Sequence, residues 1–505
     1  MVLGTFSLLL LNFVGRVYAA RHLTLAQFGD FNLGLAFAGL LALTALLGLN
    51  QALARTLAGN PDPAVRRRLI RWAGGVTTIT GVVSSVLVFL LAGSIASLFD
   101  PAGSAELTLV FQMFSVTVGL TLLCTFLAAI FQGFEDTVPN AWLNQTVQPA
   151  SFVIFLFVLL ALHLSLAGVL LAWVLSNLVT FFALLAFTVW RLPRYLPPGP
   201  VSSELPKGLW SLSLALWGIS TLTFATAYAD TLVLGVLRPE SQVGLYSAVM
   251  TLARLILVVG AAVTYIFLPV ASRLSGLGQA QTLGRVFTTA TRWIMIVTLP
   301  VFLVLALLPG DSVREIFGVA YLPAAGALVV ITTGSFLSIL FGPVNAALAG
   351  LGATRPLLLA AGVSTLANLI LSVTLIPLYG LLGAALAWTL ARVLYPGSLA
   401  YALYSTYHIH PFRRSLLLPL ASALLVGVPV FLAVPLLHLP LWSVFPSYFL
   451  GLGITVGAVL LTHSAEEGDL VLCDLAEGVL KRPLPRLRRL LERSIHPGER
   501  LVHGP

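Results

Sequence analysis

The stretch FVIFLFVLLALHLSLAGVLLAWVLSNLVTFFALLAF, at residues 152–187, contains no Asp, Glu, Lys or Arg. A helix needs about 20 apolar residues to cross a hydrocarbon core of about 30 Å, so this stretch supplies most of two transmembrane helices. Comparable apolar runs recur along the 505 residues, of which 58% are hydrophobic and 9% charged. Soluble domains carry about 25% charged residues, which excludes an ordinary soluble enzyme. Because the runs are continuous rather than alternating, they also exclude a transmembrane β-barrel.

Turn residues and charged loops divide the chain into fourteen predicted transmembrane helices. The fold class is therefore all-α, that of a polytopic membrane protein. The predicted spans lie near residues 3–20, 29–54, 72–98, 105–131, 139–163, 165–190, 208–236, 243–272, 285–308, 323–350, 356–377, 380–405, 415–437 and 441–463.

Positive charge in the short loops predicts the orientation of the chain. Loops after even-numbered spans carry thirteen Arg or Lys residues, whereas loops after odd-numbered spans carry three. Cytoplasmic loops are enriched in Lys and Arg, so both termini are expected on the cytoplasmic side of a cell membrane. The net charge of +9 is explained by these loops and the C-terminal tail rather than by binding to nucleic acid. The first apolar segment follows no basic leader and is expected to be retained.

Three landmarks indicate an internal repeat. FGDFN at 28–32 resembles VGLYS at 243–247, and GVLLAW at 168–173 matches GAALAW at 383–388, both at a sequence offset of 215. Between them, Gly133 and Pro139 match Gly350 and Pro356 at an offset of 217. The predicted domains are a six-helix bundle at 1–205, its repeat at 206–410, two extra spans at 411–463 and a cytoplasmic tail at 464–505. Six spans per repeat give both copies the same orientation, an arrangement in which transporters bind substrate between the halves.

Motifs for hydrolysis, nucleotide binding or metal binding are absent from the sequence. It contains no GxSxG, HExxH, Walker A loop or Cys/His metal spacing, so we expect no enzymatic activity, cofactor or metal site. His408 and His410 are expected to form a solvated pair in a loop. Any uphill transport would therefore draw on an ion gradient, with H⁺ or Na⁺ as the candidate ion, on the membrane potential or on consumption of the product.

Four ionisable residues lie well inside predicted spans, namely Arg16, Asp230, Arg254 and Arg392. A charge in lipid is costly unless it is paired or hydrated, so such residues usually face an internal cavity. Arg254 and Arg392 lie eleven and twelve residues from the outer ends of their spans, which places them near the bilayer midplane. We expect both to line a cavity, with a structural bond to a polar neighbour as the alternative.

Arg16 and Asp230 occupy nearly equivalent positions in the two repeats, because Arg16 shifted by the offset of 215 falls on Thr231. These opposite charges could form an ion pair that closes an outer gate, or each could be satisfied within its own half. Asp230 is also the best candidate for coupling to an ion, since it is the one acid well inside a predicted span.

Other polar residues have less specific roles. Arg55, with Arg66, Arg67, Arg68 and Arg71, forms a cytoplasmic cationic cluster that either sets topology and contacts lipid headgroups or captures substrate. Asn177 falls on Arg392 when it is shifted by the same offset, so this position is polar in both repeats. Polar residues inside the spans could line a sugar-binding cavity or join helices, and they are Asn50, Gln51, Asn144, Gln145, Gln148, Asn177, Asn345 and Asn368.

Residues 1–410 resemble the oligosaccharide flippases of the multidrug/oligosaccharidyl-lipid/polysaccharide exporter superfamily. The resemblance is carried by the order and spacing of ARHLTLAQFGDFNLGLAF (20–37), GLNQALAR (48–55), ADTLVLGVLRPESQVGLYSAVMTLARL (229–255), LPVASRL (268–274), GPVNAALAGLGATRP (342–356) and LIPLYGLLGAALAW (375–388).

This resemblance implies two six-helix bundles around a central cavity that opens alternately to each side of the membrane. It also implies a polyprenyl-diphosphate-linked oligosaccharide as substrate, moved from the inner to the outer leaflet for cell-surface polysaccharide synthesis. Arg16, Arg254 and Arg392 would then neutralise the diphosphate, because Arg forms bidentate bonds with phosphate. Membrane lipids and a polysaccharide polymerase or transferase are the expected partners.

Several alternatives remain. With fourteen predicted spans, the chain is similar to the lipid II flippases of peptidoglycan synthesis. In those proteins the extra helix pair forms a groove for the lipid tail. An ion-coupled multidrug exporter would depend mainly on Asp230 and would tolerate neutral residues at the internal arginines. A membrane glycosyltransferase or polymerase would need a larger external loop than this sequence has, and a scaffold for an assembly complex would use its internal charges for structure alone.

Overall fold

The computed structural model describes residues 2–101, 105–206 and 208–410, with isolated positions between 421 and 453. These residues are almost entirely helical and include no β-strand, which confirms the all-α prediction. The two extra spans expected at 411–463 and the tail at 464–505 lie outside the described residues, apart from those isolated positions.

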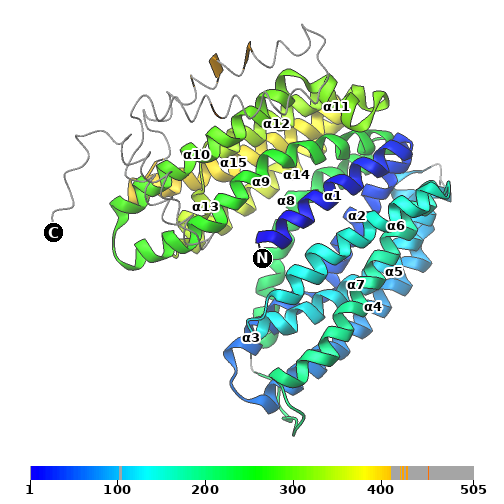
Figure 1. The fold of residues 1–505 in the computed structure, drawn as a ribbon, viewed down its shortest axis with the longest axis vertical. Helices are drawn as coiled ribbons and strands as arrows, with labels where there is room; N and C mark the ends of the chain where they lie inside the picture. The colour runs from blue at the N-terminus through cyan, green and yellow to red at the C-terminus, as the bar shows by residue number, and fades with distance from the viewer. Residues whose placement is uncertain are drawn as a thin grey trace. The chain divides into compact units, whose positions relative to one another are not determined.

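Contacts between residues divide the chain into two compact units. The first unit contains residues 1–248 and 372–384, and in it α5 packs against α2, α3, α4 and α7 (Figure 1). Its elements are α1 (Val2–His22), α2 (Leu25–Leu46), α3 (Leu49–Gly59), α4 (Pro63–Phe99), α5 (Ala105–Gly133), the π-helix η1 (Asn140–Val147), α6 (Gln148–Ala161), α7 (Leu166–Tyr195), α8 (Leu209–Leu237) and the start of α9 (Glu240–Gly276).

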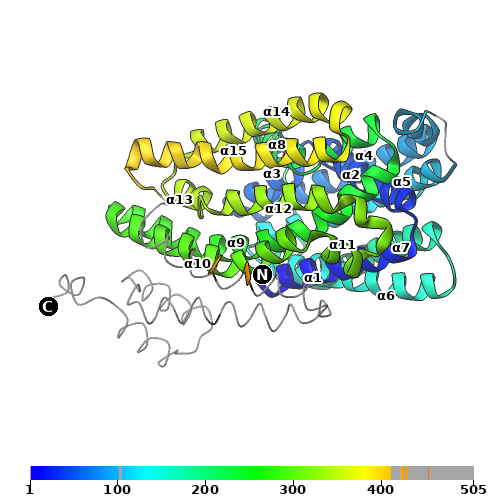
Figure 2. The ribbon, with the colours of Figure 1, turned by 90° about the horizontal axis from the view of Figure 1, so that it is seen from above.

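The second unit contains residues 249–371 and 385–505. Within it α12 packs against α10 and α11, and α14 and α15 run beside each other (Figure 2). After the remainder of α9, its elements are α10 (Ala280–Leu307), α11 (Pro309–Phe317), the 3₁₀-helix η2 (Val319–Ala324), α12 (Ala325–Ile339), α13 (Val344–Gly350), and the greater parts of α14 (Thr354–Tyr379) and α15 (Leu381–Tyr407).

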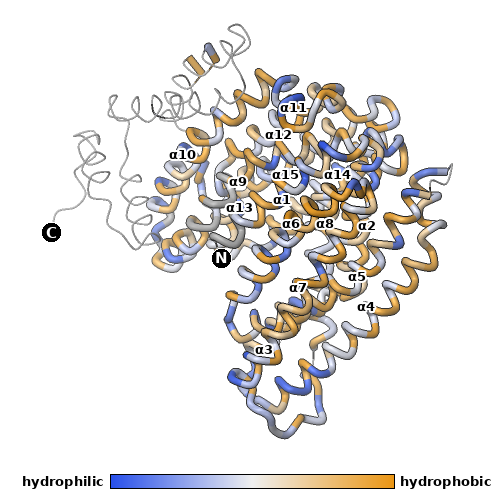
Figure 3. The backbone as a smooth tube through the Cα atoms, turned by 45° about the vertical axis from the view of Figure 1, so that its right-hand side comes forward, coloured by the Kyte–Doolittle hydropathy of each residue, from blue (hydrophilic) through white to orange (hydrophobic). Residues whose placement is uncertain are grey.

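The helices are long and apolar, and many of their large apolar side chains are exposed. Ten segments within the described residues are long and apolar enough to cross a membrane. Large apolar side chains on their outer faces are exposed, as at Leu90, Val189 and Leu359, which are 70–71% exposed. Hydrophilic residues lie mostly at helix ends and in loops (Figure 3). The chain is therefore a multi-pass membrane protein, because such faces would be unstable in water.

The twelve spans predicted within residues 1–410 all coincide with helices, but the second is broken into α2 and α3 and the tenth into α12 and α13. Leu47 and Gly48 both have positive φ, at 46° and 76°, and this turn ends α2 and begins α3. A Cβ at Gly48 would collide with the carbonyl oxygen of Ser213, whose hydroxyl donates to the Leu47 carbonyl at 2.7 Å. The contact with α8 thus requires glycine at this break, although the apolar pattern continues through it.

The fifth span also departs from a regular helix, because its first eight residues form the π-helix η1. Pro149 follows directly and has no N–H to offer the carbonyl four residues earlier. Just before it, the N–H of Gln148 donates to the carbonyl of Leu143, five residues back. The wider π turn avoids the clash that a proline ring causes in an α-helix.

Glycines at equivalent positions approach equivalent residues in the two units. A Cβ on Gly133 would lie 3.1 Å from the Ala54 carbonyl oxygen, and a Cβ on Gly350 would lie 2.7 Å from the Ala271 side chain. Positions 54 and 271 differ by 217, as do 133 and 350. In both units a glycine at a helix end lets a neighbouring helix approach closely, which is the pattern that a duplicated fold gives.

The two copies of the repeat touch where α2 and α9 begin, inside the first unit. A Cβ on Gly29 would collide with the Glu240 carbonyl oxygen, and a Cβ on Gly244 would collide with the Leu25 carbonyl oxygen. Both pairs of positions, 29 with 244 and 25 with 240, are 215 apart, so the contact is reciprocal. Only glycine allows the two backbones to come this close.

A late part of the chain, residues 372–384, also belongs to the first unit. Arg238 at the end of α8 donates to the carbonyl oxygens of Ile376 at 3.3 Å and Pro377 at 2.5 Å, near the end of α14. An arginine that caps helix carbonyls also complements the negative end of the helix dipole. Contacts therefore divide the chain after Ala248, whereas the repeat divides it after residue 205, and the repeat boundary stays a prediction.

Candidate functional site

Arg16 of α1 is held by α2 in the first unit. Its guanidinium donates to the Asn32 side-chain oxygen at 3.1 Å. The amide nitrogen of Asn32 donates to the Phe28 carbonyl of its own helix at 2.7 Å, which turns the oxygen toward Arg16. Asn32 is buried and Arg16 is half-buried. A neutral amide of α2 thus orients the guanidinium.

Asp230 of α8 is fully buried, as is its partner Tyr246 of α9. The Tyr246 hydroxyl donates a hydrogen bond to the Asp230 carboxylate. This bond offsets part of the cost of burying a carboxylate away from water. The gate ion pair between Asp230 and Arg16 stays a prediction.

Arg392 of α15 is positioned from two sides in the second unit. Its neighbour Ala391 accepts a bond from Ser364 of α14 at 2.7 Å, and Thr389 donates to the Val330 carbonyl of α12 at 3.0 Å. The guanidinium lies 5.9 Å from the ring centroid of Trp388. Its buried Nε makes no hydrogen bond with the described residues.

The backbone of Arg392 also has spare hydrogen-bonding capacity. Pro396 stands four residues later, and a proline inside a helix leaves the carbonyl four residues before it without the usual N–H donor. Arg392 therefore has a positioned guanidinium over an aromatic ring and a backbone carbonyl that lacks its usual helical N–H donor.

Asn177 occupies the equivalent place in the first unit. It is 7% exposed and donates to the Trp173 carbonyl at 2.8 Å. Trp173 and Trp388 are related by the repeat offset of 215, as are Asn177 and Arg392. Each unit therefore has a polar side chain one turn after an equivalent tryptophan, but only the second unit places a cation there.

Two buried ionisable residues were not predicted from the sequence, and the first is Arg292 of α10. It is 1% exposed, although it lies seven residues inside the predicted span 285–308. The rule that selected Arg254, which is half-buried in α9, applies equally to Arg292 and would have found it. Among its described residues, the second unit therefore carries three arginines inside predicted spans rather than two.

Asp30 of α2 is the second missed charge. It is 3% exposed, and its Oδ1 has no hydrogen-bond partner among the described residues. Glu240, Glu106 and Asp100 are close enough to act on it electrostatically. Its burial was not predicted, because it lies at the start of a predicted span and residues at span ends are usually in contact with water.

Arg55 is exposed on α3, and two neighbouring arginines have structural roles. Arg66 donates to the Asn60 carbonyl at 2.5 Å. Arg67 donates to the carbonyls of Pro197 at 3.0 Å and Pro200 at 2.6 Å, and so ties the segment after α7 to α4. At least these two members of the cationic cluster organise loops, while Arg55 is accessible.

Several polar side chains within the spans form hydrogen bonds with other side chains. Gln51 of α3 donates to the Ser220 hydroxyl of α8 at 2.8 Å. Asn144 donates to Asn140 within the π-helix at 3.0 Å, and Gln148 donates to Ser176 of α7 at 3.5 Å. Gln51 and Gln148 therefore join helices, the second of the two roles considered for them.

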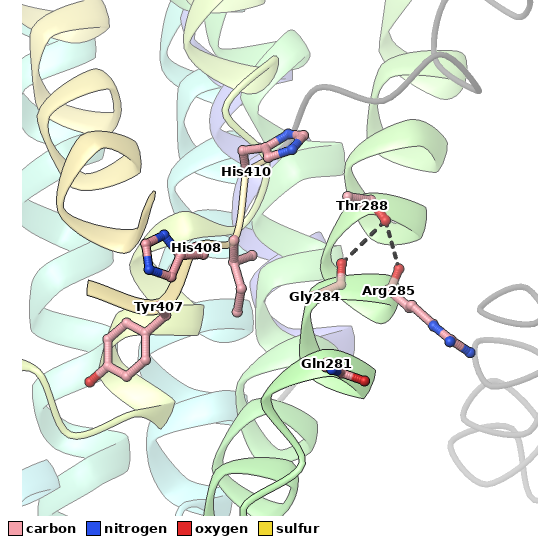
Figure 4. A pocket seen from close by; sticks show the side chains of 8 residues that line it. Gln281, Gly284, Arg285, Thr288, Tyr407, His408 and His410 are labelled. Carbon is pink, nitrogen blue, oxygen red and sulfur yellow. Dashed lines mark hydrogen bonds between the residues drawn. The ribbon is translucent and has the colours of Figure 1, made fainter. Parts of the chain in front are cut away.

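A cavity of about 450 Å³ lies between the start of α10 and the end of α15 (Figure 4). His408 and His410 are exposed, and each lies about 6 Å from the Tyr404 ring, while Ile409 between them is buried. The Arg285 side chain points away from the histidines in Figure 4. The cavity is lined by Gln281, Gly284, Arg285, Thr288, Tyr407, His408, Ile409 and His410.

Comparison with known proteins places this chain among polysaccharide biosynthesis proteins. The family described as "Polysaccharide biosynthesis protein" matches residues 1–275. A similar protein is the probable low-salt glycan biosynthesis flippase Agl15 of Haloferax volcanii. The two are 22% identical over 415 residues, covering 79% of each chain.

Solved structures share the fold at low sequence identity. The lipid II flippase MurJ, in an inward closed conformation, aligns with a TM-score of 0.70 and 14% identity, over 91% of this chain and 97% of that chain. An inward-facing multidrug resistance MATE family transporter of the MOP superfamily aligns with a TM-score of 0.62 and 16% identity, over 79% and 96%. At these identities the likeness shows the fold alone.

Proposed function

Since this chain belongs to the polysaccharide biosynthesis protein family, whose model matches more than half of its length, we propose that it is a flippase for a lipid-linked oligosaccharide. The substrate is a polyprenyl-diphosphate-linked oligosaccharide, and it moves from the inner to the outer leaflet of the cell membrane by alternating access. The similarity to a glycan biosynthesis flippase supports this proposal. The protein acts as a transporter rather than an enzyme, with both termini in the cytoplasm.

The observation that carries the proposal is Arg392. Its guanidinium lies over the Trp388 ring, and its buried Nε donates no hydrogen bond to any described residue. Such a guanidinium is available to bind an anionic ligand. Phosphate oxygens are its best partners, because they accept charge-assisted bonds from the planar fork of donors. Arg254 of the same unit and Arg16 of the first unit add the further charge that a diphosphate requires.

The remaining predicted residues have supporting roles in this mechanism. Asn177 hydrogen-bonds the sugars, and Arg55 attracts the anionic headgroup at the cytoplasmic surface. Asp230 and Arg16 form the outer gate, and protonation or cation binding at Asp230 links the gate to an H⁺ or Na⁺ gradient. A polymerase or transferase on the outer surface then consumes the flipped product and pulls the equilibrium forward.

Two alternatives have support from the fold. A lipid II-type precursor also carries a diphosphate on a polyprenyl chain, and MurJ shares the fold. An ion-coupled multidrug exporter is the second alternative, because a multidrug resistance MATE family transporter also shares the fold. The arginines favour an anionic substrate over a cationic drug, because cations are repelled by a guanidinium-lined site.

The test is a proteoliposome assay with a fluorescent polyprenyl-diphosphate oligosaccharide. We compare wild type with Arg254→Ala and Arg392→Ala, and with Arg355→Ala as a matched control because Arg355 is an exposed arginine of the same unit. Headgroup translocation is expected to fall by roughly a hundredfold in the first two variants, since removal of a charged hydrogen-bond partner costs about 2–3 kcal/mol. The control is expected to keep the wild-type rate.

Two results would contradict the proposal in different ways. Equal rates in all four proteins would refute the anion site and leave the flippase. Absence of translocation by folded wild type, with and without an ion gradient, would refute the flippase. Parallel assays with lipid II and with a cationic dye then decide between the two alternatives.

A further inference from the structure

A second cavity, of about 560 Å³, lies in the first unit where α5 and α7 end. Four aromatic residues, one arginine, two acids and a valine line it, namely Phe134, Phe187, Trp190, Tyr195, Arg191, Glu135, Asp136 and Val138. The loop that carries the acids is firmly shaped. Glu135 has φ 60°, and the N–H of Asp136 donates to the Phe131 carbonyl at 2.9 Å, which closes the end of α5.

Opposite charges in this cavity are kept apart. The Asp136 carboxylate accepts from the Tyr195 hydroxyl at 2.8 Å and from the Val138 N–H at 3.0 Å. The Arg191 guanidinium lies over the rings of Trp190 and Tyr195, 5.7 and 5.8 Å from their centroids. Within the described part of the chain, Arg191 and Glu135 form no ion pair or side-chain hydrogen bond. A pocket whose positive and negative groups are not paired with each other is complementary to a ligand that carries both a negative and a positive charge.

The aromatic faces are already covered, which argues against a sugar stacked on them. The Phe134 ring stacks on Tyr195, with centroids 5.3 Å apart, and Arg66 lies 5.4 Å from the Phe134 centroid. Trp190 carries the guanidinium of Arg194 at 4.7 Å in addition to that of Arg191. The rings therefore orient the arginines and form walls, while the charged groups remain available to a ligand.

The rim of the cavity is apolar and exposed. Trp190 is 60% exposed and Val138 56%, and Trp142 and Val189 nearby are also exposed. These residues stand where apolar helices give way to charged residues. Trp and Tyr favour the boundary between lipid and water, where one side of the ring is apolar and the other wet.

The geometry points to a binding site for a zwitterionic phospholipid whose headgroup joins a phosphate to a primary ammonium, as in phosphoethanolamine. Arg191 binds the phosphate, and Glu135 and Asp136 accept hydrogen bonds from the ammonium. The acyl chains follow the apolar rim past Val138 and Trp190 into the bilayer. This inference is independent of the transport proposed above, because none of these residues belongs to the proposed substrate site.

Native mass spectrometry of the full-length protein in mild detergent tests the site. Phosphatidylethanolamine, phosphatidylcholine and phosphatidylglycerol with identical acyl chains are titrated separately. Wild type is expected to bind phosphatidylethanolamine about tenfold more tightly than phosphatidylcholine, because a trimethylammonium group cannot donate the charge-assisted bonds that a primary ammonium gives. Phosphatidylglycerol, which lacks the ammonium, is expected to bind as weakly as phosphatidylcholine.

Variants separate the two halves of the headgroup. Glu135→Gln with Asp136→Asn is expected to bring the two zwitterionic lipids within about twofold of each other, since the ammonium loses its acceptors. Arg191→Gln is expected to weaken both lipids and to keep their ratio. Arg194→Gln is the matched control, because it removes the same charge from the next turn of α7 without lining the cavity. Glu135→Gln alone covers the case in which Asp136→Asn impairs folding, because Glu135 is exposed.

Four outcomes would overturn the inference. Wild type could bind the two zwitterionic lipids equally, or the acid variants could keep the preference. Phosphatidylglycerol could bind most tightly, which would make the site simply anionic. Finally, glycerophosphoethanolamine without acyl chains could compete as well as the intact lipid, which would make the ligand a soluble phosphate compound.

Discussion

At the scale of single residues, Asp230 shows how the fold accommodates a charge that cannot reach water. Tyr246, equally buried, supplies a hydroxyl to it from the next helix. Tyr246→Phe removes that donor and keeps the ring. We expect a loss of about 1.5–3 kcal/mol in stability, because a hydrogen bond to a charged group contributes about that much.

Thermal unfolding in detergent, followed by tryptophan fluorescence, measures this loss. Tyr401→Phe is the matched control, because Tyr401 is 74% exposed and its hydroxyl is accessible. A Tyr246→Phe midpoint equal to that of wild type would show that the buried bond contributes nothing to stability.

At the scale of helices, the break between α2 and α3 depends on Gly48. Gly48→Ala would force an L-residue to φ 76° and push its Cβ against the Ser213 carbonyl. We expect destabilisation by more than about 1 kcal/mol. Gly75→Ala in α4 has the opposite expectation, a gain of about 0.5–1 kcal/mol, because an alanine Cβ there meets open space in a regular helix.

The same unfolding assay compares the two substitutions. Opposite shifts of the midpoint would assign the break to backbone geometry at Gly48. A Gly48→Ala protein as stable as wild type would mean that α2 and α3 can merge into one helix, as the apolar pattern alone suggests.

At the scale of the whole molecule, the loop charges predict which ends of the helices face the cytoplasm. In a background with Cys124→Ser and Cys473→Ser, single cysteines are introduced at Ser203 and Pro239, which are exposed in the loops before and after α8. A membrane-impermeant maleimide is expected to label Pro239→Cys in intact cells and Ser203→Cys only in inside-out vesicles. The reverse pattern would contradict the orientation.

The sequence predicted the helices of residues 1–410, because long apolar runs indicate membrane-spanning helices. The repeat boundary stays a prediction, since it rests on sequence landmarks alone. It did not predict the break at Gly48 or the π-helix before Pro149, since both arise from contacts and clashes that leave the hydropathy unchanged. Arg254 and Arg392 stood out as charges in apolar runs, whereas Asp30 did not because it lies at a span end. The partners of Arg16 and Asp230, Asn32 and Tyr246, come from helix packing, which composition does not encode.

The place of residues 372–384 in the first unit has a consequence for synthesis of the chain. The ribosome completes residue 248 well before residue 384, and at about 5–20 residues per second the stretch between them takes on the order of ten seconds. During that interval Arg238 has no carbonyls of Ile376 and Pro377 to cap. The first unit is therefore finished only after about half of the second has been translated, and a nascent chain released in between carries an incomplete first unit into the membrane.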